Sequence, residues 1–241
     1  MPLLRGEPRS SAFLDRVPRS GMLSYRAPTL AVVVSDFTAA WVPYQLGREF
    51  AAAAVAAMRW AEDQAARRGL PAVLVTDRKG EYHGEALFES YLNGRHASPR
   101  SPRVNVRPGA VIAHVPTPGA LEVATRLARG NALVVVEHPS PWRLAGWAGV
   151  VGALDLDTGE PTTLDPQLHE HLNELVRYGN NGYARGYGRD GAHRVLADMA
   201  GAGLLDRDVV LSALSAYDIS PAAQLVISSL IDKVAPLLSH R

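Results

Sequence analysis

The sequence predicts an α/β protein: a Rossmann-like or flavodoxin-like, mostly parallel sheet, followed by an all-helical C-terminal region. Short valine-rich runs recur along the first part of the chain, and segments with helical periodicity separate them. These runs lack polar alternation, which indicates strands buried on both faces. Beyond Asp165-Pro166 the strand signals stop. Buried strands that alternate with helices form βαβ units, which are parallel and right-handed.

Three parts are expected along the chain. Residues 1–27 mix proline, arginine, serine and glycine without a sustained period, which is typical of a flexible basic arm. Residues 28–164 carry the strand signals and form the predicted Rossmann-like α/β domain. Residues 165–241 form the predicted helical domain.

The expected strands and helices of the α/β domain alternate in order. The strands are the runs TLAVVVSDF, AVLVT, AVIAHV, ALVVV and VVGALDL. Helices are expected over residues 47–68, 84–93 and 117–130, residues 142–148 form a short helix or a turn, and residues 95–107 read as an arginine-rich loop. Thr117-Pro118 is a typical helix start, because threonine caps the free N–H groups and proline fits the first turn.

The helical domain shows four helical segments. They are expected at about residues 166–178, 190–202, 206–216 and 220–238. Asp165-Pro166 and Ser220-Pro221 supply the same N-cap and first-turn proline as Thr117-Pro118.

Composition limits the classes of function. The 241 residues have a formal net charge of +1, which argues against attachment to polyanions by bulk charge alone. The chain has no cysteine, so disulfides and thiol catalysis are excluded. No apolar run reaches the roughly 18 residues that a membrane span needs, and no secretory signal is recognisable. No membrane partner is expected, and the expected location is cytoplasmic.

Polar residues end the predicted strands and mark a candidate site. Ligands of open parallel sheets bind outside the carboxyl ends of the strands, where helix N-termini also point. The acid–base candidates at this edge are Asp36, Asp77, Glu137 and His138, and the ligand-binding candidates are Ser35 and His114. No metal site is assigned among them.

The segment from Arg177 to Arg189 interleaves glycine, tyrosine and arginine between two predicted helices. In one interpretation it is a connector whose tyrosines pack on the helices. In the other it is a loop over a ligand, in which Tyr183 stacks on a ring while Arg185 and Arg189 hold phosphates. The sequence leaves both open.

Several familiar motifs are missing. There is no Gly-x-Gly-x-x-Gly after the first strand and no Walker A sequence, which disfavours ordinary dinucleotide and P-loop chemistry. Gly-x-Ser-x-Gly is also absent, which weighs against an α/β-hydrolase. His169-Glu170-His171 has the wrong helical spacing for a zinc site, since ligands three or four residues apart share a face. The cofactor is therefore unknown.

One local pattern has a named parallel. His138-Pro139-Ser140-Pro141 resembles the His-Pro-Ser-Pro loop of uracil-DNA glycosylases, in which the histidine contacts the flipped base. The resemblance would make His138 a base contact and Ser140 a phosphate contact. It covers four residues, and the family's Gly-Gln-Asp-Pro-Tyr segment has no match here.

Three hypotheses for function remain. The first is an enzyme or binding protein that handles a nucleotide or another phosphorylated small molecule at the carboxyl edge of the sheet. The second is a nucleic-acid-binding or regulatory protein that uses the arginine-rich loops and the C-terminal helices, since residues 190–202 and 206–216 have helix-turn-helix-like spacing. The third is a homo-oligomeric interaction or assembly protein that uses apolar faces of the C-terminal helices.

Overall fold

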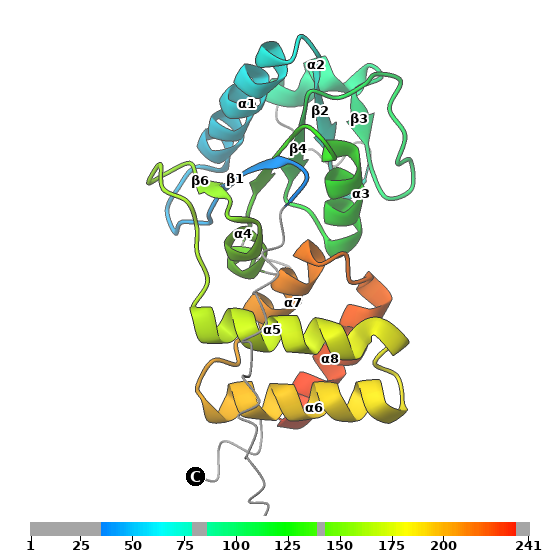
Figure 1. The fold of residues 1–241 in the computed structure, drawn as a ribbon. Helices are drawn as coiled ribbons and strands as arrows, with labels where there is room; N and C mark the ends of the chain where they lie inside the picture. The colour runs from blue at the N-terminus through cyan, green and yellow to red at the C-terminus, as the bar shows by residue number, and fades with distance from the viewer. Residues whose placement is uncertain (1–34, 79–85, 139–142, 235–241) are drawn as a thin grey trace, which may run out of the picture. The chain divides into compact units, whose positions relative to one another are not determined.

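The α/β class with a helical C-terminal region is what the computed structural model shows (Figure 1). The structure describes residues 35–78, 86–138 and 143–234. Six parallel strands form one sheet in the order β3-β2-β4-β5-β1-β6. They are β1 (Thr38–Val42), β2 (Ala72–Val75), β3 (His96–Ala97), β4 (Ala110–His114), β5 (Ala132–Val136) and β6 (Leu154–Asp155).

The first described strand differs from the predicted one. The run TLAVVVSDF was expected as the first strand, but its residues up to 34 lie outside the described ranges. The chain forms β1 from the next residues, TAAWV, which pair with β5 along their whole length from Thr38 opposite Ala132. Ser35 and Asp36 therefore precede β1.

The other strand expectations hold with shifts at their ends. β2, β4 and β5 fall on the predicted runs AVLVT, AVIAHV and ALVVV. The run VVGALDL gives only the two-residue β6, because its first residues complete a helix that ends at Gly152 with φ 63°. The expected loop 95–107 contains β3, whose two residues pair with Leu74 and Val75 at the sheet edge.

Helices cover both faces of the sheet (Figure 1). One face packs on α1 (Phe50–Arg67), on the 3-10 turn η1 (Ala86–Phe88) and on α2 (Glu89–Leu92). The other packs on α3 (Pro118–Ala128) and α4 (Ala145–Val151). Side chains of each strand alternate between these two cores, so that Trp41 and Val75 face α3 and α4 while Val42 and Leu74 face α1.

The C-terminal helices have a core of their own. They are α5 (Pro166–Tyr178), the 3-10 turn η2 (Gly179–Asn181), α6 (Gly186–Gly201), α7 (Arg207–Ala216) and α8 (Pro221–Val234). The predicted starts of two helices are confirmed, since the Thr117 hydroxyl accepts from the N–H of Ala120 and the Asp165 carboxylate accepts from Gln167 and Leu168. None of the helices within the described ranges is both long and apolar enough to cross a membrane.

α7 lies against α4 at very short range (Figure 1). Gly146 of α4 makes this approach possible, because a Cβ atom there would stand 1.9 Å from the Val209 carbonyl oxygen and 2.7 Å from the Ser212 hydroxyl. Val150 on the same helix enters the core of the C-terminal helices. The glycine therefore allows α4 to belong to both cores.

We expect Gly146→Ala to lower the free energy of unfolding by about 1–3 kcal/mol, because the added methyl group meets backbone and forces the two helices apart. Chemical denaturation of the purified chain measures this. Gly201→Ala at the end of α6 is the matched control, since a Cβ there meets nothing within 4 Å. The control should be neutral or stabilising by up to about 1 kcal/mol. Equal effects of the two substitutions would contradict the close-packing interpretation.

Candidate functional site at the carboxyl edge of the sheet

The carboxyl edge contains a point where neighbouring strands send the chain to opposite faces. After β1 the chain runs to α1 on one face, and after the adjacent β5 it runs to α4 on the other. Such a topological switch point opens a crevice between the two loops, and it is the usual ligand position in open α/β sheets. A second divergence separates β2, which leads to α2, from β4, which leads to α3.

Glu137 directly follows β5 and lies between the loops that follow β1 and β5. Its carboxylate is fully buried. One oxygen accepts from the backbone N–H of Tyr44 at 2.7 Å, and the other accepts from the N–H of Leu144 at 2.7 Å and from Nε of Arg143 at 3.2 Å. Three donors satisfy this charge, which burial would otherwise make very costly. The geometry assigns Glu137 to holding the two loops together.

Aromatic rings gather beside Glu137. The ring centroid of Phe50, at the start of α1, lies 4.9 Å from that of His114 and 5.5 Å from that of His138. Both pairs are edge to face. Phe88 contacts the other side of His114 at 4.7 Å, and Tyr44 lies 6.2 Å from His138. Edge-to-face pairs of this kind are favourable and rigid. We call these five residues the ring cluster: Tyr44, Phe50, Phe88, His114 and His138.

The loop that carries Tyr44 is tied down on a second side. Arg48 pairs with Asp157 in the turn after β6, and the amide of Gln45 donates to the same carboxylate at 2.9 Å. The Arg48 guanidinium also donates to the carbonyl of Pro43 at 3.2 Å. The loop after β1 is thus held from both β5 and β6.

Arg143 is anchored at one nitrogen and open at the others. Its Nε donates to Glu137, and its guanidinium lies 5.7 Å from the Tyr44 ring centre. Among the described residues, its two terminal nitrogens have no recorded hydrogen bond, and nearly half of the side chain is exposed. An arginine fixed in this way presents two N–H groups to an anion.

Asp77 and Thr76 end β2 at the neighbouring divergence. Asp77 accepts from the Thr117 hydroxyl at 2.5 Å, which joins the end of β2 to the start of α3. The Thr76 hydroxyl donates to the carbonyl of Arg78 at 2.8 Å and lies 2.7 Å from Nε2 of His96. Because the single hydroxyl proton is used, Nε2 of His96 is the donor in that contact.

Val115 adds strain at this edge. It follows His114 with φ 47°, in the left-handed region that β-branched residues rarely adopt. Such a conformation costs on the order of 1–3 kcal/mol, and strained backbone is concentrated at functional sites. The strained backbone of Val115 therefore indicates that the residues packed around the end of β4 impose its conformation.

The structure separates residues that the sequence analysis placed together. Asp77, His114, Glu137 and His138 do lie at the carboxyl edge. Ser35 and Asp36 lie at the opposite, amino edge, where the Asp36 carbonyl accepts from the N–H of Gly130 at the end of α3. Their expected place at the carboxyl edge was wrong because the strand begins after them. Within the described ranges, no three histidine or acidic side chains come together as metal ligands.

Two tyrosines of the glycine-, tyrosine- and arginine-rich segment, Tyr178 and Tyr183, pack in the helical part, whereas Tyr187 is 73% exposed. Tyr183 is only 3% exposed and its hydroxyl donates to the Leu175 carbonyl at 3.1 Å. Its ring covers Gly179, and the Tyr178 ring covers Gly191, where a Cβ atom would stand 2.1 Å away. For these two tyrosines, the contacts agree with the interpretation in which the tyrosines pack on the helices. Arg185 and Arg189 are exposed at the start of α6.

Of the ring cluster, the sequence analysis named only His114 and His138, and it missed the other three rings and Arg143. Nothing in the spacing of Tyr44, Phe88 or Arg143 shows that they meet. The residues that follow His138 in the glycosylase-like pattern, Pro139 to Pro141, lie outside the described ranges. No family model, no curated protein and no solved structure matches the chain.

We expect Glu137→Gln to lower the free energy of unfolding by about 1–3 kcal/mol. The amide offers one acceptor oxygen in place of two, and its NH₂ group would face an N–H donor in a buried site. Denaturant titration measures the change. Glu160→Gln, at an exposed carboxylate, is the control and should have little effect. A stability of Glu137→Gln equal to that of the control would contradict the role assigned to this carboxylate.

Alkaline pH tests the burial of Tyr183. Burial raises the pKa of its hydroxyl from the ordinary 10.0 to about 12. Because the folded pKa lies above the unfolded one, the protonated form stabilises the fold fully below pH 10.0, and this stability is lost as the pH rises toward 12. We expect Tyr183→Phe to lose stability less steeply over this interval, in denaturation curves taken at several pH values. The half-buried Tyr217, whose pKa is raised to about 12, remains in the variant, so some slope persists. An unchanged slope would contradict the assignment.

Proposed function

We propose that the chain binds a nucleotide or a closely related phosphorylated small molecule at the carboxyl edge of its sheet. The observation that carries this proposal is the position of Arg143 beside the ring cluster. An anchored guanidinium with two open nitrogens suits a phosphate, and half-buried rings next to it suit a planar base.

Each part of the ligand has a candidate contact. Tyr44, Phe50 and His138 are half-buried and form the accessible side of the ring cluster, where a base would lie. Arg143 would bind the phosphate. Asp77 has, among the described residues, a recorded hydrogen bond at only one carboxylate oxygen, the one from Thr117, and is the acid–base or hydroxyl-binding candidate. Glu137 supports the site by fixing the backbones of Tyr44 and Leu144 and the Nε of Arg143, without contacting the ligand.

The nucleic-acid alternative finds less support. In a helix-turn-helix the second helix must enter the major groove. Here α7 is the second helix, and it is covered by α4 at Gly146 and begins with Asp206 and Asp208, which would repel phosphates. The assembly alternative has two exposed apolar side chains in its favour, Tyr187 on α6 and Leu225 on α8. Light scattering of the full chain measures its oligomeric state and so tests the assembly alternative.

Calorimetric titration with matched probes tests the proposed function. The probes are the common ribonucleoside mono- and diphosphates, each base as its unphosphorylated nucleoside, and inorganic phosphate. We expect at least one nucleotide to bind. Arg143→Gln should weaken it by about tenfold or more while leaving the nucleoside unaffected, a loss of about 1.4 kcal/mol that occurs only when phosphate is present.

The complementary variant removes a ring. Phe50→Leu should weaken the nucleotide and its nucleoside by similar factors, because it acts on the base. Arg59→Gln, at an exposed arginine in the middle of α1, is the charge-matched control and should bind like the parent chain. The proposal is overturned if no probe binds, or if Arg143→Gln binds nucleotides as tightly as Arg59→Gln does.

A further inference from the structure

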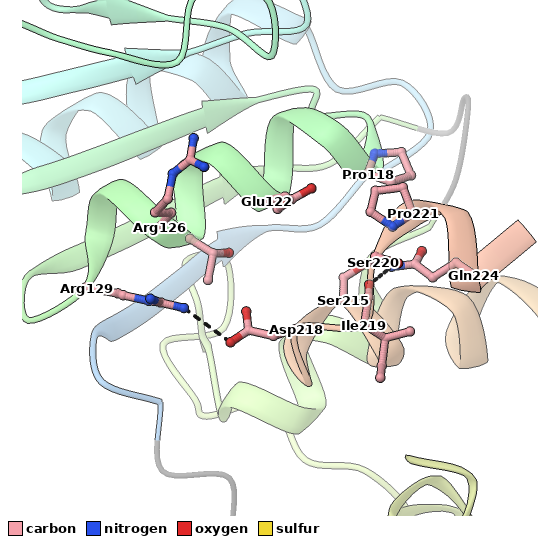
Figure 2. Close-up of a pocket in the computed structure, with 11 residues that line it drawn as sticks. Pro118, Glu122, Arg126, Arg129, Ser215, Asp218, Ile219, Ser220, Pro221 and Gln224 are labelled. Atoms are coloured by element: carbon pink, nitrogen blue, oxygen red, sulfur yellow. Dashed lines mark hydrogen bonds and ion pairs between the residues drawn. The ribbon is translucent and has the colours of Figure 1, made fainter. Parts of the chain in front are cut away.

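A pocket of about 220 Å³ lies between α3 and the turn that joins α7 to α8 (Figure 2). It is separate from the carboxyl-edge site, since no residue of the ring cluster lines it. Pockets for drug-sized ligands span roughly 300–1,000 Å³, so this volume suits a smaller molecule than a nucleotide.

Two arginines and two acidic residues line the pocket. Arg129 pairs with Asp218 at 3.4 Å, as Figure 2 shows, and its Nε also lies 4.0 Å from the Asp36 carboxylate, so its charge is already compensated. Glu122 and Arg126 also line the pocket and stand one helical turn apart on α3. Charges at this spacing commonly pair along a helix. No ion pair or hydrogen bond is recorded for either side chain with the described residues.

One negative and one positive side chain are therefore left at the same pocket. In Figure 2 the Arg126 guanidinium points away from Asp218. It belongs to an exposed side chain, which changes rotamer within nanoseconds and can turn to a ligand. A ligand that satisfies both groups must carry an anion for Arg126 and a cation for Glu122.

The rest of the lining is uncharged. Hydroxyl groups come from Thr125, Ser215 and Ser220, and apolar surface comes from Pro118, Ile219 and Pro221. The amide of Gln224 is already used, because it donates to the Ser215 hydroxyl and to the Ile219 carbonyl. These two hydrogen bonds fix the shape of the turn from within.

We propose that this pocket binds a free α-amino acid. Arg126 binds the ligand's carboxylate, Glu122 binds its ammonium group, and the two prolines with Ile219 contact a small or apolar side chain. A phosphorylated ligand fits less well, because the pocket's charges sum to zero and its volume is small. The bound amino acid contacts both α3 and the α7–α8 turn, so binding stabilises the packing of these two elements.

The test is calorimetric titration of the full chain with each of the twenty proteinogenic L-amino acids singly. Propionate and propylamine are the partial probes, since each carries only one of the two charges. We expect at least one amino acid to bind about tenfold or more tightly than either partial probe. Glu122→Gln and Arg126→Gln should each weaken that amino acid by about tenfold or more. The melting temperature of the parent chain should rise with the same amino acid.

Matched controls separate the pocket from general surface charge. Arg59→Gln on α1 and Glu170→Gln on α5 replace exposed residues outside the pocket and should bind like the parent chain. All four sites are exposed, so each variant is expected to fold, and circular dichroism checks this. The proposal is overturned if no amino acid binds, if propionate binds as tightly as the amino acid, or if Glu122→Gln and Arg126→Gln bind like the controls. Nucleotide binding at the sheet edge is measured with different probes and is unaffected by any of these outcomes.

Discussion

The buried carboxylate of Glu137 is the constraint on which the carboxyl edge of this protein depends. β1 and β5 are neighbours, yet the chain leaves them toward opposite faces of the sheet, so their loops would otherwise diverge. A buried carboxylate requires donors on every side, because an unpaired charge in the interior is very costly. Its hydrogen bonds to Tyr44, Arg143 and Leu144 bring the two loops together. The anion that lies between these two loops is thus the Glu137 carboxylate, a side chain of the protein itself.

This arrangement decides what remains for a ligand. In many open α/β sheets, backbone N–H groups at the switch point bind the phosphate. Here two such groups already bind Glu137, whereas the terminal nitrogens of Arg143 have no recorded hydrogen bond with the described residues. The rings of Tyr44, Phe50 and His138 lie on the same side. The edge therefore offers one guanidinium and a set of planar surfaces, which differs from a glycine-rich phosphate loop.

Glycines determine how the helical part is built and attached. Gly146 lets α7 approach the backbone of α4, and Gly179 and Gly191 receive the rings of Tyr183 and Tyr178. The same residues that give the segment its ligand-loop composition are therefore packing partners. The contact of α7 with α4 also covers the helix that a DNA-binding role would need. Close packing of rings on glycines thus explains the glycine- and tyrosine-rich pattern. Composition alone is equally consistent with a loop that binds a ligand.

The sequence by itself determined the class of fold, three of the six strands nearly to the residue and the starts of α3 and α5. These features are local: a buried run of valines, or a threonine or aspartate before proline, carries its own signal. The tertiary structure decided which residues form β1, because TAAWV becomes a strand only through its pairing with β5, nearly a hundred residues later. Because β1 begins at Thr38, Ser35 and Asp36 lie at the amino edge of the sheet. The meeting of Phe50, His114, His138 and Arg143 likewise depends on strand order, which no local pattern encodes.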